Sequence, residues 1–168
     1  MKFRQATLED LPALMEIVQD AIQVLCQQGS PQWQNGYGPN EEKLRNDIEA
    51  KVMFVLEDVS ILAMGALIPG IDPVYTAIQD GQWEGNASYL SIHRIAVAKQ
   101  SAGKGLAKSL LIHLVNEGHR QGIRDVRIDT HELNIGMQRA ILATGFHYRG
   151  IVYFPIPDGK RYAYQKLG

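Results

Sequence analysis

Hydrophobic positions recur every three or four residues in four stretches of the chain, and this spacing is typical of amphipathic helices. Before the first stretch, Thr7 and Asp10 can form a capping box that marks the helix start. Gly122 and Gly145 follow the last two stretches and can end them. The predicted helices cover residues 8–27, 41–51, 103–121 and 135–144.

Short apolar runs bounded by turn residues predict seven strands. They cover residues 3–6, 52–57, 61–68, 89–98, 125–130, 148–154 and 161–166. Turn residues at 58–60 and 158–159 join two pairs of these strands into antiparallel hairpins. The unit 89–130 is strand, helix and strand, which favours a parallel pair with a right-handed crossover.

Two segments, 28–39 and 69–86, contain several glycines and prolines and cannot be regular structure. A structureless stretch as long as the second one is usually functional or mobile inside a compact domain. We therefore expect both segments to contribute to a binding pocket.

The composition predicts a single globular domain over residues 1–168, with 45% hydrophobic and 21% charged residues. The net charge of −1 and the lack of a basic run argue against nucleic acid as a partner. No apolar stretch approaches the ~20 residues that cross a bilayer, so no membrane partner is expected. The lone Cys26 excludes an internal disulfide and indicates a reducing, cytoplasmic setting. We expect it to be a small buried hydrophobic residue.

The segment 92–107 contains the end of a strand, a turn with two glycines and the start of a helix. Glycines at 103 and 105 let the backbone approach a ligand, and the first amides of a helix point outward unpaired. With the helix dipole, they form an anion site that suits a diphosphate. The spacing matches neither a P-loop nor a dinucleotide motif, because Lys108 stands where the latter has its last glycine. A nucleotide-binding regulatory module that uses this turn is a competing interpretation.

Four features in this order resemble the GNAT family of N-acetyltransferases over nearly the whole chain. They are the strand and helix start at 3–11, the strand 94–97, the loop and helix 103–111, and Asn134 followed by Gly145-Phe146. The resemblance implies an α/β (α+β) GNAT-like fold with a central mixed, mostly antiparallel twisted sheet of six to seven strands. That sheet would be splayed between its fourth and fifth strands, with about four helices on both faces.

The resemblance also implies acetyl-CoA as co-substrate and no metal. The residues expected to contact the coenzyme are Ile95, Ala96, Val97, Ser101, Ala102, Gly103, Lys104, Gly105, Leu106, Ala107, Asn134, Met137 and Ile141. The family loop usually begins with Gln or Arg; two registers are possible here, and the preferred one places Ala102 at that position. Phosphate binding would then depend on backbone N–H groups, with Lys104 as a helper.

A second departure concerns the tyrosine that often follows the family's asparagine by seven residues and protonates the departing thiolate. Here this position is Ile141. Tyr153 or Tyr162 could replace the missing hydroxyl, or the amine could attack directly in a ternary complex. A non-catalytic acyl-CoA-binding or regulatory domain with the same fold is the alternative.

Four residues are candidates for catalysis: His131, His93, Val97 and Asp129. The N–H of Val97 could face the developing oxyanion. A histidine is suited to accept a proton from the amine. By strand parity, His93 is expected on the same face as Ile95 and Val97, and His131 and Asp129 are expected to face the cleft. A structural role is the competing interpretation for each histidine.

The acceptor is expected to be a primary amine of a small molecule or peptide. Aromatic rings in the two irregular segments could bind it by stacking, although packing roles compete. These rings belong to Trp33, Tyr37, Tyr75 and Trp83. The C-terminal hairpin could pair with its copy in another subunit, so a homodimer is possible.

Overall fold

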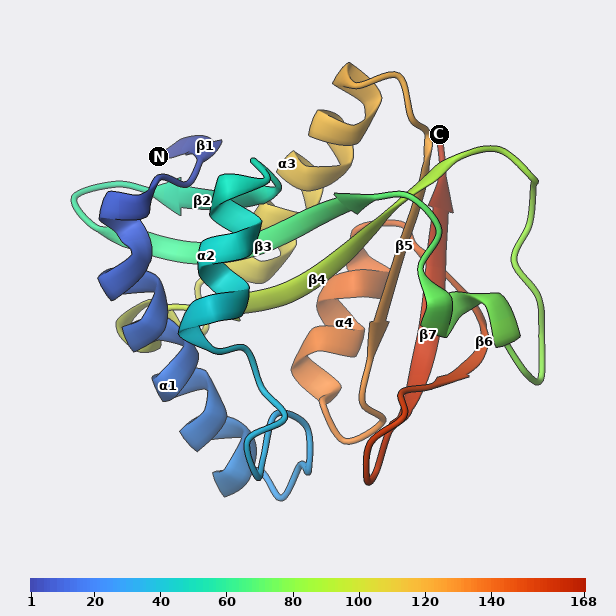
Figure 1. The fold of residues 1–168 in the computed structure, drawn as a ribbon, viewed down its shortest axis with the longest axis horizontal. Helices are drawn as coiled ribbons and strands as arrows, with labels where there is room; N and C mark the ends of the chain where they lie inside the picture. Colours follow the sequence, from blue (N-terminus) through green and yellow to red (C-terminus); the bar gives the residue numbers. More distant parts are fainter.

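The computed structural model describes all 168 residues and contains one seven-stranded sheet in the order β1-β2-β3-β4-β5-β7-β6 (Figure 1). The strands are β1 (Lys2–Gln5), β2 (Met53–Glu57), β3 (Ile61–Pro69), β4 (Tyr89–Val97), β5 (Asp125–Thr130), β6 (His147–Tyr153) and β7 (Lys160–Leu167). Neighbouring strands are antiparallel except β4 and β5, which are parallel. The predicted mixed, mostly antiparallel sheet is therefore confirmed.

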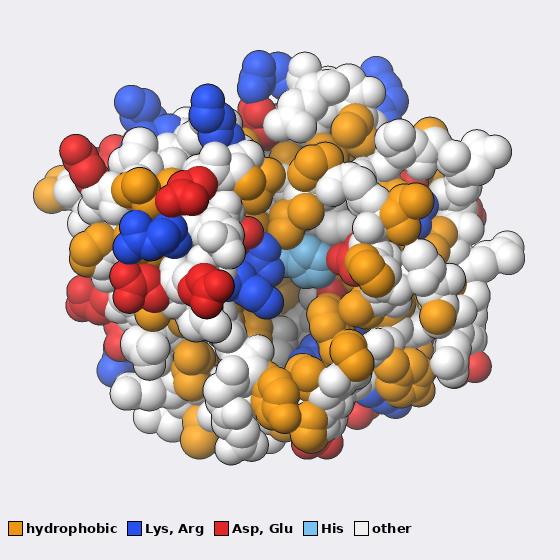
Figure 2. Space-filling view, viewed as in Figure 1, with side chains coloured by type: hydrophobic (Ala, Val, Ile, Leu, Met, Phe, Trp, Pro, Cys, Tyr) orange, Lys and Arg blue, Asp and Glu red, His pale blue; other side chains and the backbone are white.

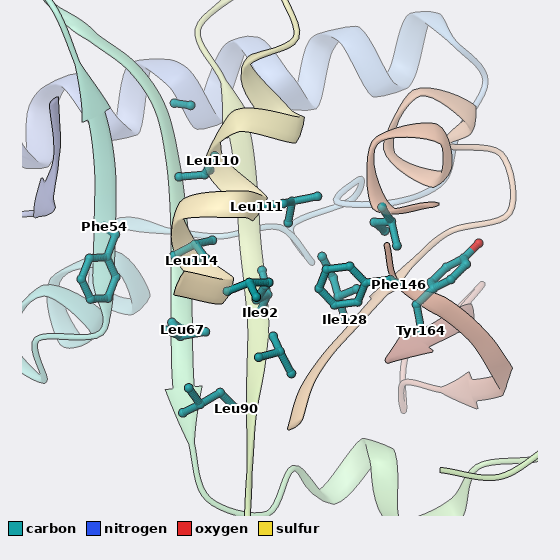
Figure 3. Packing of buried hydrophobic residues seen from close by; sticks show 14 of the residues in the cluster. Phe54, Leu67, Leu90, Ile92, Leu110, Leu111, Leu114, Ile128, Phe146 and Tyr164 are labelled. Atoms are coloured by element: carbon teal, nitrogen blue, oxygen red, sulfur yellow. The ribbon is translucent and has the colours of Figure 1, made fainter. Parts of the chain in front are cut away.

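Four α-helices cover the two faces of the sheet (Figure 1). They are α1 (Leu11–Gln27), α2 (Glu41–Glu49), α3 (Leu106–Arg120) and α4 (Ile135–Ala143). On one face, Leu14 of α1 and Leu44 of α2 join a buried cluster with strand residues such as Met64. On the other, Leu110 and Leu114 of α3 pack over β3 and β4 (Figure 3). No helix is long and apolar enough to cross a membrane.

Strands β4 and β5 pair over only four residues each, Tyr89–Ile92 against Asp125–Ile128. Both strands continue beyond this pairing, so they diverge from His93 and Asp129 onward. Figure 1 shows them as a V with α4 visible between the arms. The predicted splay between the fourth and fifth strands is confirmed.

A β-bulge in β4 lies where the splay begins. Ala66 of β3 faces His93 and Met64 faces Ala96, so Gly65 alone faces two residues of β4, Arg94 and Ile95. Arg94 has the left-handed φ of 57°, and its guanidinium pairs with the Asp47 carboxylate of α2, with Nη2 3.0 Å from Oδ1. The extra residue is what re-aims the strand.

The bulge changes which side chains share a face. Before it, Ile92 joins the cluster under α3, and His93 faces the other way. After it, Ile95 and Val97 pack on the α3 side, whereas Ala96 joins the α1 side. The prediction that His93 shares a face with Ile95 and Val97 is therefore wrong, because one inserted residue reverses the alternation.

The segment 69–86 is not a loose loop. It contains a short 3₁₀ turn (Pro73–Ala77), and Gln79 exchanges two backbone hydrogen bonds of 2.8 Å with Ile151 of β6. Tyr75 is 1% exposed, and its carbonyl accepts a 2.8 Å hydrogen bond from the Trp83 indole. The segment therefore packs on the β5–β7–β6 half of the sheet and covers part of the outer edge of β6.

Cys26 is exposed on α1, so the expectation of a buried cysteine is wrong. The helix buries its stripe through residues such as Leu25, and the next position along the chain points away from that stripe.

Candidate active site

A cleft of about 1030 Å³ opens where β4 and β5 diverge. One wall consists of the loop before α3 and one side of α4 along its length, and the other of the end of α1, the α1–α2 connection and the β6–β7 loop. Figure 2 shows a hollow in the middle of the viewed face, with a histidine side chain in it and charged side chains of both signs beside it. Residues from both faces of the splayed sheet line the cleft, such as Ile95 from the α3 face and His93 from the other.

The start of α3 presents unpaired amides to this cleft. No backbone or side-chain group accepts a hydrogen bond from the six N–H groups of residues 103–108. The residue before the helix is Gly105, which has φ 72° and offers no capping side chain. By contrast, the side chain of Asn134 caps α4 by accepting from the Met137 amide at 3.3 Å. An uncapped helix start of this kind is suited to an anion.

The expected coenzyme-binding loop lies at the cleft. Its lining includes Ser101, Ala102, Gly103, Gly105, Leu106 and Ala107. Lys104 is exposed beside the loop and does not line the cleft. Lys99, Lys108 and Arg139 do line it, so an anion bound here would meet both the backbone amides and these side chains.

The edge of β4 that faces the gap also carries free backbone groups. The amide of Ala98 donates to the Leu62 carbonyl of β3 at 2.8 Å. Because backbone groups alternate along a strand, those of Ile95 and Val97 point to the opposite edge, toward the cleft. Together with Ala96, both residues line it.

Helix α4 contributes Asn134 and Met137 to the cleft but not Ile141. Ile141 is fully buried in the cluster with Phe146, so its expected contact with the coenzyme is wrong. Tyr153 and Tyr162 also lie outside the lining, and the Tyr162 hydroxyl donates to Glu132 at 3.2 Å. No tyrosine therefore replaces the missing hydroxyl from these positions.

His93 lies in the cleft and is held by Asp72 from the segment 69–86. The distance from its Nε2 to Asp72 Oδ2 is 2.7 Å, and its Nδ1 has no protein partner. Burial works to raise the pKa of Asp72, but the hydrogen bond and charge of His93 outweigh it, so this pKa is lowered. Asp72 is therefore an anion that fixes the ring orientation.

Asp129 lies across the gap from His93 on the same face. Its Oδ2 accepts a 2.6 Å hydrogen bond from the hydroxyl of the buried Tyr75. Burial raises the pKa of Asp129, although the charges of His93 and Arg161 and the bond from Tyr75 partly counter it. Burial raises the pKa of Tyr75 too, so this hydroxyl stays protonated and donates.

His131 does not face the cleft, and this expectation is wrong. Its side chain is buried, and its Nδ1 accepts a 3.1 Å hydrogen bond from the amide of Leu133. Burial lowers its pKa. The ring therefore supports the turn that leads from β5 to α4.

The four aromatic residues separate into two groups. Trp33 and Tyr37, from the α1–α2 connection, line the cleft as expected. Tyr75 and Trp83 do not, because they pack behind it, where the Arg127 guanidinium lies 4.5 Å from the Trp83 ring centre and 3.8 Å from that of Tyr89. Their predicted role as direct acceptor contacts is therefore wrong.

Two charged residues beside His93 and Asp129 escaped the sequence reasoning: Arg161 lines the cleft, whereas Asp72 pairs with His93 without lining it. Asp72 lies in an irregular segment, and Arg161 lies on β7, far from any motif. Only the pairing of β7 with β5 brings Arg161 to Asp129, and no local pattern signals it. No group of three or more His, Cys, Asp or Glu side chains is arranged to hold a metal ion.

A family model described as the acetyltransferase (GNAT) family matches residues 18–146, more than half of the chain. The chain belongs to the GNAT family. The match includes the splayed strands, the loop before α3 and α4, so most of the cleft lies within it, whereas the β6–β7 loop and Arg161 lie beyond it.

Solved structures of GNAT acetyltransferases share the whole fold. One from Streptococcus agalactiae 2603 is 37% identical, with a TM-score of 0.89 over 99% of this chain and 95% of its own. One from Listeria monocytogenes 4b F2365 is 20% identical, with a TM-score of 0.76 over 99% and 94%. The acetyltransferase yncA from Salmonella typhimurium, solved with acetyl-CoA, is 17% identical, with a TM-score of 0.69 over 99% and 92%. A search of curated proteins found no match.

Proposed function

We propose that this GNAT protein transfers an acetyl group from acetyl-CoA to a primary amine by direct attack in a ternary complex. The observation that carries the proposal is the row of six unpaired amides at 103–108, since all of these residues except Lys104 line the same cleft as His93. A diphosphate needs several converging donors, and this helix start supplies them from its backbone, with Lys108 of its first turn also lining the cleft. The complex of yncA with acetyl-CoA supports the same co-substrate for this fold.

The residues present fit the coenzyme. The cleft of about 1030 Å³ extends from the amides at the start of α3 past Asn134 and Met137 to the free edge of β4. Asn134 keeps its Nδ2 as a donor because only its Oδ1 caps the helix. When bound, acetyl-CoA supplies the electrophilic thioester carbonyl, and the amide of Val97 at the open edge would polarise it.

His93 is the proposed general base. A primary amine with a pKa of about 10 is mostly protonated at neutral pH and cannot attack until it loses a proton. If Nε2 of His93 donates to Asp72, its Nδ1 is the acceptor that takes this proton. A new N–C bond then forms as the C–S bond breaks; the second proton that the nitrogen loses ends on the departing CoA thiolate, and the proton on His93 passes to solvent.

The absence of a tyrosine from α4 agrees with direct attack. Holding two reactants side by side can by itself supply up to about 7–11 kcal/mol in favourable cases. A thiolate is also a good leaving group at neutral pH, because a free thiol has a pKa of about 8.5.

The test is release of the CoA thiol with a broad panel of amines, with mass spectrometry to detect the acetylated product. We expect turnover by the wild type and a large loss in His93→Gln. His147→Gln is the matched control, since His147 is exposed on β6 and outside the cleft. Equal turnover by both variants would remove His93 from the base role.

Because the buried Ile141 stands where the family often has its tyrosine, a second candidate function is a non-catalytic acyl-CoA-binding domain. That function predicts thermal stabilisation by acetyl-CoA together with no thiol release across the panel. Stabilisation with turnover supports the enzyme.

A further inference from the structure

Three ionisable side chains from three strands project onto one face of the splayed sheet. They are His93 of β4, Asp129 of β5 and Arg161 of β7. Arg161 shares the face of Ala163, which packs with Tyr75, whereas the alternate residues Tyr162 and Tyr164 face α3. Asp129 pairs with Ala163 in the β5–β7 register, so Arg161 lies two positions beyond it on the same face.

Arg161 is a buried arginine without a carboxylate partner. It is 5% exposed, and it takes part in none of the ion pairs of the protein. Its Nη1 donates to the carbonyls of Asp158 and Lys160 at 2.6 and 2.9 Å. Its Nε and Nη2 have no protein acceptor, and they are not sealed from the cleft that the residue lines.

A buried guanidinium with free donors destabilises the folded protein unless a ligand supplies the missing anion. A buried guanidinium without a paired anion carries a large desolvation cost. Burial lowers the pKa of Arg161, and the negative charge of Asp129 only partly offsets this. Arginine presents a planar fork of donors, which matches a carboxylate or phosphate.

Acidic side chains lie close to Arg161. Asp129 and the Asp72–His93 pair surround the point where β4 and β5 separate. Carboxylates at this point favour an amine that arrives as a cation, and His93 can then accept its proton. A cationic pole and an anionic pole therefore lie side by side on the acceptor face.

On the basis of the proposed function, we infer that the acceptor is a small amino carboxylate of the amino-acid class. Its carboxylate binds the free donors of Arg161, and its amine lies between Asp129 and His93. A phosphate is disfavoured, because a dianion would lie beside the Asp129 carboxylate with one guanidinium to balance it. A polyamine is disfavoured, because its second cation would meet Arg161.

The walls around the two poles are largely apolar. Trp33 and Tyr37 line the cleft from one side, and Phe154, Pro155 and Ile156 of the β6–β7 loop line it from the other. The Arg161 guanidinium lies 5.5 Å from the centre of the Phe154 ring. These surfaces suit the side chain of an apolar or aromatic amino acid.

The test compares the standard amino acids with their α-amides as acceptors, by thiol release with acetyl-CoA. We expect the wild type to prefer the best amino acid over its amide, and Arg161→Gln to lower kcat/KM for that amino acid by about 30-fold or more. The same variant should change kcat/KM for the amide by less than about threefold, since the amide makes no ion pair. Comparing each acceptor with itself across variants cancels differences in amine basicity.

Lys160→Gln is the matched control. Lys160 is the neighbouring cation, but it pairs with Glu132 at 3.8 Å and does not line the cleft. Lys160→Gln should leave kcat/KM unchanged for both the amino acid and its amide. Arg161→Lys keeps the charge without the fork and should fall between wild type and Arg161→Gln.

A second measurement needs no variant, in case Arg161→Gln fails to fold. Carboxylates that lack the amine, such as 3-phenylpropanoate and 4-methylpentanoate, should compete with the acceptor in the wild type, and their amides should not.

Equal use of acids and amides, or an equal loss for both in Arg161→Gln, would overturn the inference. If only neutral amines or polyamines are acetylated, the proposed function stands and this inference falls. If no amine yields thiol, both fall.

Discussion

Nε2 of His93 lies 2.7 Å from Oδ2 of Asp72, and the two residues come from different parts of the molecule. His93 is on β4 at the point where β4 leaves β5, and Asp72 is in the irregular segment before β4. The bulge at Arg94 lets His93 face this segment while Ile95 and Val97 face α3. Because of this one inserted residue, the proposed base His93 lies on the opposite face of the sheet from Ile95 and Val97.

Replacing Asp72 tests this pairing. In Asp72→Asn, the amide no longer fixes the ring as an anion does, so kcat should fall by at least about tenfold, less than the ~10²–10⁴-fold expected for His93→Gln. KM for acetyl-CoA should not change, since Asp72 lies outside the coenzyme path. Steady-state kinetics measures both, with Asp80→Asn, an exposed residue of the same segment, as control. Wild-type kcat in Asp72→Asn would contradict the assignment.

Asp129 should make stability depend on pH in a defined direction. Burial raises its pKa above the ordinary 3.8, so between these two values the folded protein binds more protons than the unfolded chain. Stability contributed by this group is therefore lost as pH rises from about 4 through the folded-state pKa. Asp129→Asn removes that loss, so its Tm should exceed that of wild type increasingly over this range, while acetylation falls. Parallel Tm–pH curves for the two proteins would argue against a destabilising buried carboxylate.

Substitutions of the two glycines that flank α3 can distinguish an effect on coenzyme binding from an effect of backbone strain alone. Gly105 at its start and Gly122 after its end have φ of 72° and 83°, and an added Cβ meets nothing within 4 Å at either. Alanine at each should cost about 1–2 kcal/mol of stability, because both positions are left-handed. Only Gly105→Ala should also weaken CoA binding, by about tenfold, since it disturbs the amides at 103–108. Calorimetry with CoA measures this, and equal affinities would contradict an anion site at this helix start.

Gly65 is the residue that allows the bulge. A Cβ there would lie 2.5 Å from Cδ1 of Ile95 and 3.1 Å from Cδ1 of Leu114. We expect Gly65→Ala to destabilise the protein by about 1–3 kcal/mol, because the surrounding core is filled. Adding Ile95→Val removes the nearest atom and should restore part of the loss, as judged by urea unfolding. No recovery in the double variant would show that the contact with Ile95 is not what makes the added methyl group destabilising.

Much of the fold could be predicted from the sequence because its signals are local. The capping residues, the glycines that follow α3 and α4, and the apolar runs of the strands each act within a few positions. The splay between β4 and β5 followed from the family resemblance, and the glycine loop before α3 was recognisable from spacing.

The details of the acceptor face could not be predicted. Strand parity placed His93 with Ile95 and Val97, because nothing in the sequence marks Arg94 as a left-handed bulge residue. Its position in an irregular segment predicts Tyr75 as a pocket residue, although its hydroxyl contacts Asp129, 54 positions away, from behind the cleft. His131 and Ile141 have the right sequence positions, but the turn after β5 and the core under α4 bury them. Each outcome depends on packing between distant segments.

The central claim is that this cleft binds acetyl-CoA by the backbone at the start of α3 and presents its thioester at the edge of β4. The most direct measurement is a crystal structure of the protein with acetyl-CoA. The account predicts a diphosphate within hydrogen-bond distance of the amides at 103–108 and the thioester beside Val97, within reach of an amine held near His93. Coenzyme bound elsewhere, or a diphosphate contacted by surface lysines alone, would contradict it.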